Sequence, residues 1–193
     1  QIIGHRGFAG KYPDNTIESF SKAIEAGATM IEFDVQLTLD YKLAVAHDQL
    51  PRSASNLLLL SDVLDEFGDS INYYVELKTY NTTLPDSKTR LVFYTVSEII
   101  RKNLKKNCLI ASFDEGCLKT AKQLGYPKLG AIYAKNETPL NTRVHCLLHK
   151  LITKPVEQLT YAWTVNDKRR MKTLMKLGVQ GIVTDYPNRL AQL

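Results

Sequence analysis

The chain of 193 residues lacks several features that mark special classes of protein. Its three cysteines are an odd number without a Cys-x-x-Cys spacing, which argues against a disulfide framework or a zinc ribbon and is typical of reduced, buried thiols. No apolar run approaches the roughly 18 residues that a transmembrane helix needs. We therefore expect a cytoplasmic protein without a transmembrane segment. Because the chain begins with Gln1, we leave open a signal peptide that has been removed.

Repeats, low-complexity stretches and linkers are also missing, so the sequence predicts a single domain over residues 1–193. The net charge of +5 is mild, and the basic residues are dispersed apart from two small clusters, Lys102–Lys106 and Lys168–Arg170. No basic stripe interleaved with aromatic residues accompanies them, so we expect no nucleic-acid partner. The charge instead suits an anionic small molecule or a transient contact with a membrane surface.

The residues that are present alternate between strand-like and helix-like segments, which is typical of parallel βαβ units. About eight strand-like segments and the absence of a glycine-rich dinucleotide loop favour a closed α/β barrel over an open sheet. The stretch Lys135–Gln158 is too short for two ordinary helices. The sequence therefore predicts a compact (β/α)8 TIM barrel in which at least one barrel helix is reduced or missing.

Local signals give boundaries for individual elements. Asn15, with Glu18 three residues on, predicts the cap of a helix that ends at Gly27. Ser61 predicts the cap of a short helix that ends at Phe67, and we interpret the ambiguous apolar stretch Val144–Ile152 as a strand. Met30–Leu37 and Tyr73–Lys78 are predicted to be buried strands.

Charged residues inside these two buried strands are the strongest functional signal. Residues two apart on a strand share a face, so Glu32 must project with Asp34, and Glu76 with Lys78. Buried charge is costly unless it meets an opposite charge or a metal ion. Glu32, Asp34 and Glu76 offer only oxygen ligands, which predicts one divalent ion, Mg²⁺ or Ca²⁺. Salt bridges to Arg6 or Lys78 are the alternative, but three carboxylates outnumber two cations.

Further ionisable groups follow other predicted strands, at the end where TIM barrels carry their active sites. His5 and His47 are candidates for a general acid and a general base. Arg6 and Lys78 are candidates for binding phosphate oxygens or for balancing the carboxylates. Trp163 could form an apolar wall for a glycerol or acyl group, with simple core packing as the alternative.

Other polar residues receive lesser roles. We expect Asp48 to orient a neighbour or to lie in a loop, and His145 and His149 to be structural. Asp114 and Asp185 end strands on the predicted active-site side, and we consider both as supports for the site. Asn15 is interpreted chiefly as a helix cap, with substrate contact as the alternative.

Taken together, these motifs resemble the glycerophosphodiester phosphodiesterase family, in family order along the whole chain. The matching segments are His5-Arg6-Gly7, Pro13-Asp14-Asn15-Thr16, Ile31-Glu32-Phe33-Asp34-Val35, His47-Asp48 with Arg52-Ser53, Val75-Glu76-Leu77-Lys78, Trp163-Thr164-Val165-Asn166 and Gly181-Ile182-Val183-Thr184-Asp185-Tyr186-Pro187.

The resemblance implies a TIM barrel that cleaves glycerophosphodiesters to glycerol 3-phosphate and an alcohol with the help of a metal ion. It implies that His5 and His47 are the acid/base pair and that Glu32, Asp34 and Glu76 are the metal ligands. Arg6 and Lys78 match phosphate-contacting positions.

The chain departs from the family after the His-Asp pair. The family usually carries a substantial insertion there, and the short connection Gln49–Leu60 lacks nearly all of it. This short form predicts an uncovered site that admits bulkier substrates. An alternative is therefore a phospholipase D-like or cyclising phosphodiesterase that acts on lysophospholipids. A short, open barrel also resembles the spider sphingomyelinase D group, although Glu76-Leu77-Lys78 and the Trp163 segment fit the first family better. A non-catalytic phosphate- or lipid-binding barrel is the third possibility, which the full set of histidines and acids disfavours.

Overall fold

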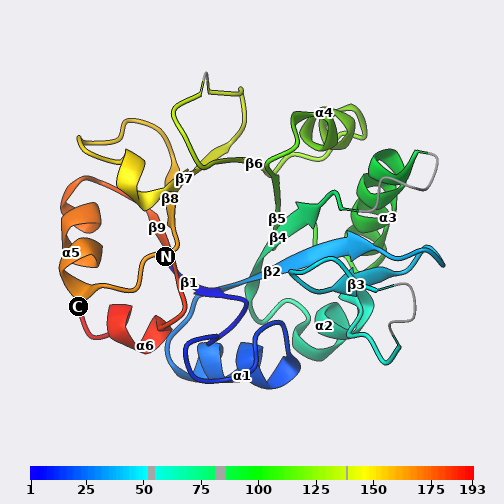
Figure 1. The fold of residues 1–193 in the computed structure, drawn as a ribbon, viewed down its shortest axis with the longest axis horizontal. Coiled ribbons are helices and arrows are strands. Elements are labelled where there is room, and N and C mark those ends of the chain that lie inside the picture. Colours follow the sequence, from blue (N-terminus) through cyan, green and yellow to red (C-terminus); the bar gives the residue numbers. More distant parts are fainter. Residues whose placement is uncertain (52–54, 81–85, 138) are drawn as a thin grey trace.

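The computed structural model describes residues 1–51, 55–80, 86–137 and 139–193. Strands and helices alternate over most of these residues (Figure 1). The strands are β1 (Ile2–His5), β2 (Met30–Leu37), β3 (Leu43–Val45), β4 (Asn72–Lys78), β5 (Cys108–Ser112), β6 (Leu129–Tyr133), β7 (Val144–Leu148), β8 (Thr160–Trp163) and β9 (Gly181–Thr184). The α-helices are α1 (Ile17–Glu25), α2 (Leu60–Phe67), α3 (Ser87–Arg101), α4 (Glu115–Gln123), α5 (Lys168–Lys176) and α6 (Pro187–Leu190).

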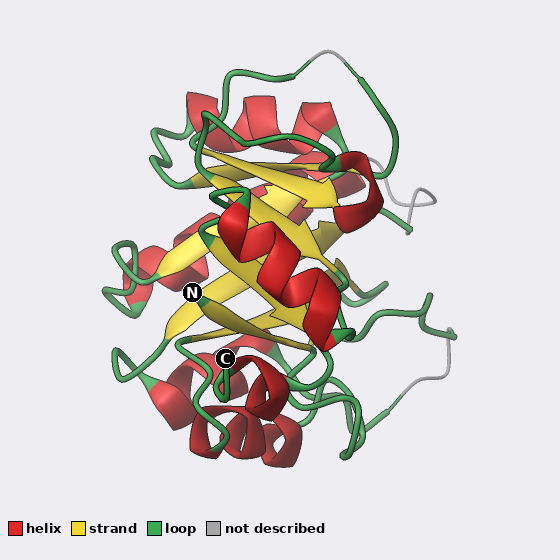
Figure 2. Cartoon of the chain, turned by 90° about the vertical axis from the view of Figure 1, so that its left-hand side faces the viewer, coloured by secondary structure: helices red, strands yellow, loops and turns green. Residues whose placement is uncertain are grey.

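Eight of the strands form a closed parallel barrel. The order runs β1-β2-β4-β5-β6-β7-β8-β9, and β9 pairs again with β1 to close the ring. The remaining strand, β3, lies outside the ring as an antiparallel partner of β2. Helices lie outside the strands, as Figure 2 shows from the side. The prediction of a reduced TIM barrel is confirmed.

In its described part, the barrel lacks α-helices in the stretch that the sequence predicted to be too short for two of them, Lys135–Gln158. Among the described residues no α-helix connects β6 to β7, and only the short 3-10 helix His149–Leu151 stands between β7 and β8. The predicted strand Val144–Ile152 was therefore too long, because the chain turns into this 3-10 helix after Leu148.

Two predicted helix caps were wrong. Thr16, not Asn15, caps α1: its backbone is extended and its hydroxyl accepts the N–H of Ser19 at 3.1 Å. Asn15 has a left-handed backbone, with φ of 55°, which turns its side chain away from the helix. Helix α2 begins before Ser61, and the carboxylate of Asp62 accepts the N–H of Leu59 at 2.9 Å.

The barrel interior is filled below the carboxyl ends of the strands. Its apolar floor consists of Ile3, Met30, Tyr74, Leu109, Ala111, Ile132, Val144, Cys146, Tyr161 and Val183. A second, larger cluster lies between the strands and the helices around them. Because close packing leaves little space below, the interior is open to ligands only at the barrel ends.

All three cysteines are buried and unpaired. Within the described ranges, no helix is long and apolar enough to cross a membrane. Arg52 and Ser53, which match the family motif, lie outside the described residues, as does most of the loop between β4 and α3.

Candidate active site

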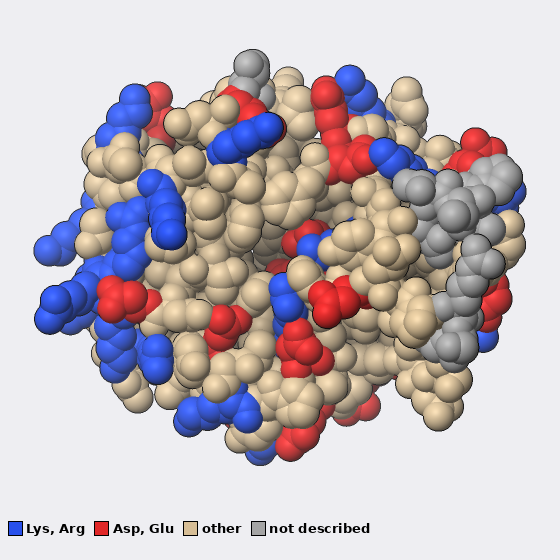
Figure 3. All heavy atoms as spheres, viewed as in Figure 1, with Lys and Arg blue, Asp and Glu red and all other residues tan. Residues whose placement is uncertain are grey.

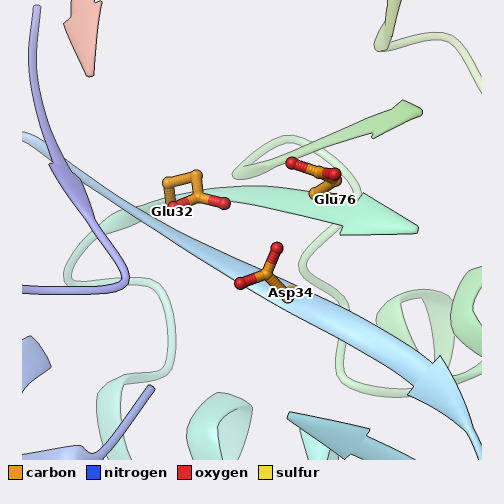
Figure 4. Close-up of side chains that lie close together, drawn as sticks. All are labelled: Glu32, Asp34 and Glu76. Carbon is orange, nitrogen blue, oxygen red and sulfur yellow. The ribbon is translucent and has the colours of Figure 1, made fainter. Parts of the chain in front are cut away.

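Three carboxyl groups converge at the carboxyl end of the barrel. Parallel pairing sets Glu32 of β2 beside His5 of β1, and Asp34 of β2 beside Glu76 of β4. The two-residue spacing within β2 directs Glu32 and Asp34 to the same face, toward Glu76 (Figure 4). One oxygen of each carboxyl group lies within 4.8 Å of the others. The triad that the sequence predicted to hold a metal therefore forms one compact cluster.

Two cationic side chains contact this cluster on the side of Asp34. Arg6 Nε lies 3.2 Å from Asp34 Oδ2, as an ion pair without the alignment of a hydrogen bond, and Lys78 Nζ lies 3.2 Å from Asp34 Oδ1. Lys78 also pairs with Glu76. Burial alone would lower the pKa of Lys78, but attraction by Glu76 and Asp34 raises it. Both predicted cations thus act as counter-ions within the site.

Glu32 has no such counter-ion. Its side chain is only 3% exposed, and its carboxylate accepts one hydrogen bond, from the backbone N–H of Arg6 at 2.9 Å. No lysine or arginine among the described residues pairs with it. Burial, followed by repulsion from Asp34, raises the pKa of Glu32 to about 8. Burial also raises the pKa of Glu76, even though Lys78 opposes the shift.

The donor set fits a hard divalent cation. Three buried carboxylates supply only oxygen ligands, and Glu32 has no lysine or arginine counter-ion among the described residues. A cation bound among Glu32, Asp34 and Glu76 would act as that counter-ion. The raised pKa values of Glu32 and Glu76 show that the positive charge around these buried carboxylates does not fully compensate their burial.

A hydrogen bond to Asp185 fixes the position of the His5 imidazole. Its Nδ1 lies 2.6 Å from Asp185 Oδ1, and Asp185 in turn accepts a hydrogen bond from Asn166 Nδ2 at 2.5 Å. Burial would lower the pKa of His5, but the hydrogen bond with Asp185 and the charge of Glu32 raise it. With Nδ1 engaged by a carboxylate, Nε2 is the ring nitrogen that has no hydrogen-bond partner among the described residues. Asp185, considered from the sequence as a support, contacts His5 directly.

The turn after β1 places Arg6 and brings its backbone to Glu32. Both Arg6 and Gly7 have positive φ, 49° and 88°. At Gly7 a Cβ would come within 2.4 Å of Ser19 Oγ, so only glycine lets this turn pack against α1. The Phe8 N–H continues the contact by donating to Ser19 Oγ at 2.8 Å.

His47 lies at the outer edge of the site, after β3. Its Nδ1 lies 2.8 Å from Asp48 Oδ1, and its side chain is 33% exposed. The buried side chain of Gln36 fixes this segment by donating to the carbonyls of Ala46 and Asp48, at 2.9 and 2.8 Å. None of the described contacts joins His47 to the three carboxylates.

Trp163 forms one wall of a narrow cavity that it shares with His5, Glu32 and Glu76. Its indole N–H donates to the carbonyl of Cys146 at 3.0 Å, and its ring meets Phe113 edge-on with the ring centres 5.6 Å apart. Phe113 is half exposed. The side chain of Trp163 therefore packs on the barrel and also lines the cavity beside the carboxylates, and its contact with a glycerol or acyl group stays a prediction.

Two residues of the site were not given their observed roles by the sequence. Asn15 is buried and donates to Asp34 Oδ2 at 3.1 Å, so it orients a carboxylate and does not cap a helix. Gln36 shares the inward face of β2 with Glu32 and Asp34, and this period of two could have identified it. Asp114, in contrast, caps α4 and pairs with Lys88.

Comparisons with known proteins agree with the family resemblance of the sequence. Two segments, residues 5–57 and 160–188, match models of the glycerophosphoryl diester phosphodiesterase family. A glycerophosphodiester phosphodiesterase of Bacillus altitudinis is 29% identical, and the match covers 100% of this chain and 97% of that protein. The alignment extends over 243 positions against the 193 residues of this chain, as a short form requires.

Solved structures of similar proteins share the fold. A glycerophosphodiester phosphodiesterase from Parabacteroides distasonis superposes with a TM-score of 0.85 at 24% identity, over 98% of this chain and 94% of that one. A phosphodiesterase from Oleispira antarctica, solved in complex with the product sn-glycerol-3-phosphate, gives 0.81 at 18% identity, over 100% and 96%. At these identities the superpositions establish the barrel alone.

Proposed function

The chain belongs to the glycerophosphoryl diester phosphodiesterase family, and from this premise we propose that it hydrolyses glycerophosphodiesters to glycerol 3-phosphate and an alcohol. The observation that carries the proposal is the convergence of Glu32, Asp34 and Glu76 beside His5 at the carboxyl end of the barrel. In TIM barrels this end is where catalytic groups gather.

The carboxylate triad is proposed to hold one Mg²⁺ or Ca²⁺ ion. Bound there, such an ion would draw negative charge from the phosphate oxygens and so favour attack at phosphorus. Arg6 and Lys78 lie beside the triad and are proposed to contact the remaining phosphate oxygens. Asn15 keeps Asp34 in position through its amide.

His5 and His47 are proposed to divide the two proton transfers of the reaction. One imidazole takes the proton of the nucleophile, either water or the glycerol 2-hydroxyl, as the new P–O bond forms. The other gives a proton to the leaving alkoxide as the old P–O bond breaks. The hydrogen bond between His5 and Asp185 supports this role, because it fixes the imidazole and leaves Nε2 free to exchange a proton.

A lysophospholipid is the second candidate substrate, and one observation favours it. The half-exposed ring of Phe113 continues the apolar wall of Trp163 outward from the site. Such a wall could cover part of an acyl chain attached to the glycerol. The chemistry at phosphorus would be the same for both substrates, and Trp163 would contact the glycerol in either.

Phosphorus NMR of the products tests the proposal directly. The protein is incubated with glycerophosphocholine and, separately, with lysophosphatidylcholine, in Mg²⁺ or Ca²⁺ and in excess chelator. Glycerol 3-phosphate from the first substrate, dependent on the ion, supports the main proposal. Lysophosphatidic acid or a cyclic phosphate from the second supports the alternative. Absence of any product with both substrates and both ions would leave only a non-catalytic binding barrel.

A further inference from the structure

One side of the barrel carries a cluster of basic side chains. Residues 150–176 contain seven basic and two acidic side chains, an excess of +5. Six of the basic residues are exposed, and we refer to them as the basic face: Lys150, Lys154, Lys168, Arg169, Lys172 and Lys176. In Figure 3 one group of blue atoms lies at the left edge, over α5.

Hydrogen bonds join the two segments of the basic face into one surface. Arg170, the seventh basic residue, turns its guanidinium inward and donates to the carbonyl of Ile152 at 2.8 Å. At the other end of α5, the Val156 N–H donates to the carbonyl of Leu177 at 3.0 Å. The segment with Lys150 and Lys154 therefore runs alongside α5.

The charges of the basic face are not used within the fold. None of its six side chains forms an ion pair with any residue that the structure describes, and Lys168 alone makes a side-chain hydrogen bond, to Gln192 at 3.0 Å. The nearby acid Asp167 caps α5 through the Arg170 N–H. Six unpaired like charges on one surface repel one another, and this repulsion destabilises the fold slightly. Binding to a surface of negative charge would relieve it.

The basic face borders the rim of the candidate active site. Asn166, two residues before α5, donates to Asp185, the residue that holds His5. Because α5 begins at this point, Lys168 and Arg169 lie at the carboxyl end of the barrel. The same view of the molecule shows both the blue edge and the central hollow that contains charged atoms (Figure 3).

We infer that the basic face docks the protein on the surface of an anionic phospholipid bilayer, with the open end of the barrel toward or beside the lipid. Clusters of four to eight lysines and arginines on a helix are typical of binding to anionic lipids. Met171 and Leu174 of α5 are buried in the core and Met175 is the one large apolar side chain exposed on this helix, so binding is expected to be chiefly electrostatic. Docking extends beyond the proposed function and does not depend on it, because binding needs no turnover.

A nucleic acid is the competing polyanion. The basic face contains no aromatic side chain for stacking on bases, and four of its six residues are exposed on α5. A broad, flat layer of phosphate head groups suits an exposed cluster of this kind better.

Vesicle sedimentation tests the inference with a matched pair of triple variants. The first, K168Q/R169Q/K172Q, removes three charges of the basic face. The control, K105Q/K106Q/K122Q, removes three exposed lysines that form no ion pair with a described residue and follow α3 or end α4, at the opposite end of the barrel. Vesicles contain phosphatidylcholine alone or with about a third of phosphatidylglycerol. Circular dichroism confirms that both variants are folded.

The wild type is expected to sediment only with the anionic vesicles and to be released by high salt, which screens the attraction. Each basic residue near such a surface contributes about fivefold to partitioning, so the first variant should bind about 100-fold more weakly. The control should stay within a few-fold of the wild type. Equal loss in both variants, binding to neutral vesicles, or tighter binding to a DNA duplex than to anionic vesicles in the same buffer would overturn the inference. Any of these results would leave the hydrolysis of soluble substrates untouched.

Discussion

The unpaired carboxylate of Glu32 allows the candidate metal site to be tested through stability alone. We predict that Glu32→Gln stabilises the protein in chelator and at the same time removes most of the stabilisation by divalent ions. Glutamine keeps the shape of the side chain, and its carbonyl can still accept the N–H of Arg6. It differs by being neutral at every pH, so it removes the cost of a buried charge without leaving a cavity.

The pKa of Glu32 sets the magnitude. It rises from an ordinary 4.5 to about 8 in the fold, so folding favours the protonated form. This contribution to the stability of the metal-free protein is therefore greatest below pH 4.5 and is lost as the pH rises toward about 8. Each pH unit in this interval costs about 1.4 kcal/mol. At pH 7 the variant should therefore be more stable by roughly 3 kcal/mol, or roughly 6–12 °C in melting temperature.

Thermal melts at several pH values, in chelator and in millimolar Ca²⁺ or Mg²⁺, provide the measurement. In chelator the variant should melt above the wild type at pH 7, with the difference vanishing toward pH 4. Added ion should raise the melting temperature of the wild type, because the ion binds only the folded state. It should raise the melting temperature of the variant much less. Glu157→Gln, at an exposed position, is the control and should change neither melt. A variant that melts at or below the wild type in chelator would refute the argument from buried charge.

Four further substitutions test the roles of individual side chains. His5→Ala and His47→Ala should each lower kcat by roughly 10²–10⁴-fold on a folded protein, and the double variant should fall little below the worse single one; near wild-type turnover in either would remove that histidine from the mechanism. Gln36→Leu should lower kcat while leaving ion-induced stabilisation intact, because it frees the segment of His47 and touches no proposed metal ligand; lost ion binding would assign Gln36 to the triad. Asp185→Asn should lower kcat and shift the part of the pH-rate profile that reports the ionisation of His5 to lower pH, since Asp185 raises the pKa of His5. A profile that does not shift would mean that the contact is only structural.

The sequence could predict the carboxylate triad because two local rules determine it. Glu32 and Asp34 are two residues apart on a strand with both faces buried, so their shared direction follows from the pleat alone. The carboxyl ends of parallel strands meet at one end of a barrel, which brings Glu76 to the same place. Neither step needs a long-range contact to be known, and both were confirmed by the register of β2 with β4.

The supporting residues could not be placed in the same way, because their roles depend on closure of the barrel and on backbone conformation. Asp185 meets His5 across 180 residues only because β9 returns to pair with β1. Asn15 has the sequence signature of a helix cap, and only its positive φ directs the amide to Asp34. The strand that precedes His47 has the pattern of a barrel strand, yet β3 pairs outside the ring.

Charge balance in the site leads to a last prediction, about the order of binding. With all three carboxylates ionised, as metal binding requires, Arg6 and Lys78 leave a formal charge of −1, and a divalent ion brings it to +1. A phosphodiester carries a single negative charge, so it fits the ion-loaded site. Without the ion the site is negative, or neutral when Glu32 is protonated, and both cations stay engaged with Asp34. We therefore expect glycerophosphocholine to bind the slow His5→Ala variant in Ca²⁺ or Mg²⁺ but at least tenfold more weakly in chelator, as measured by titration calorimetry. Equal affinity in both buffers would mean that Arg6 and Lys78 bind the phosphate by themselves, and that the triad is a structural salt-bridge network.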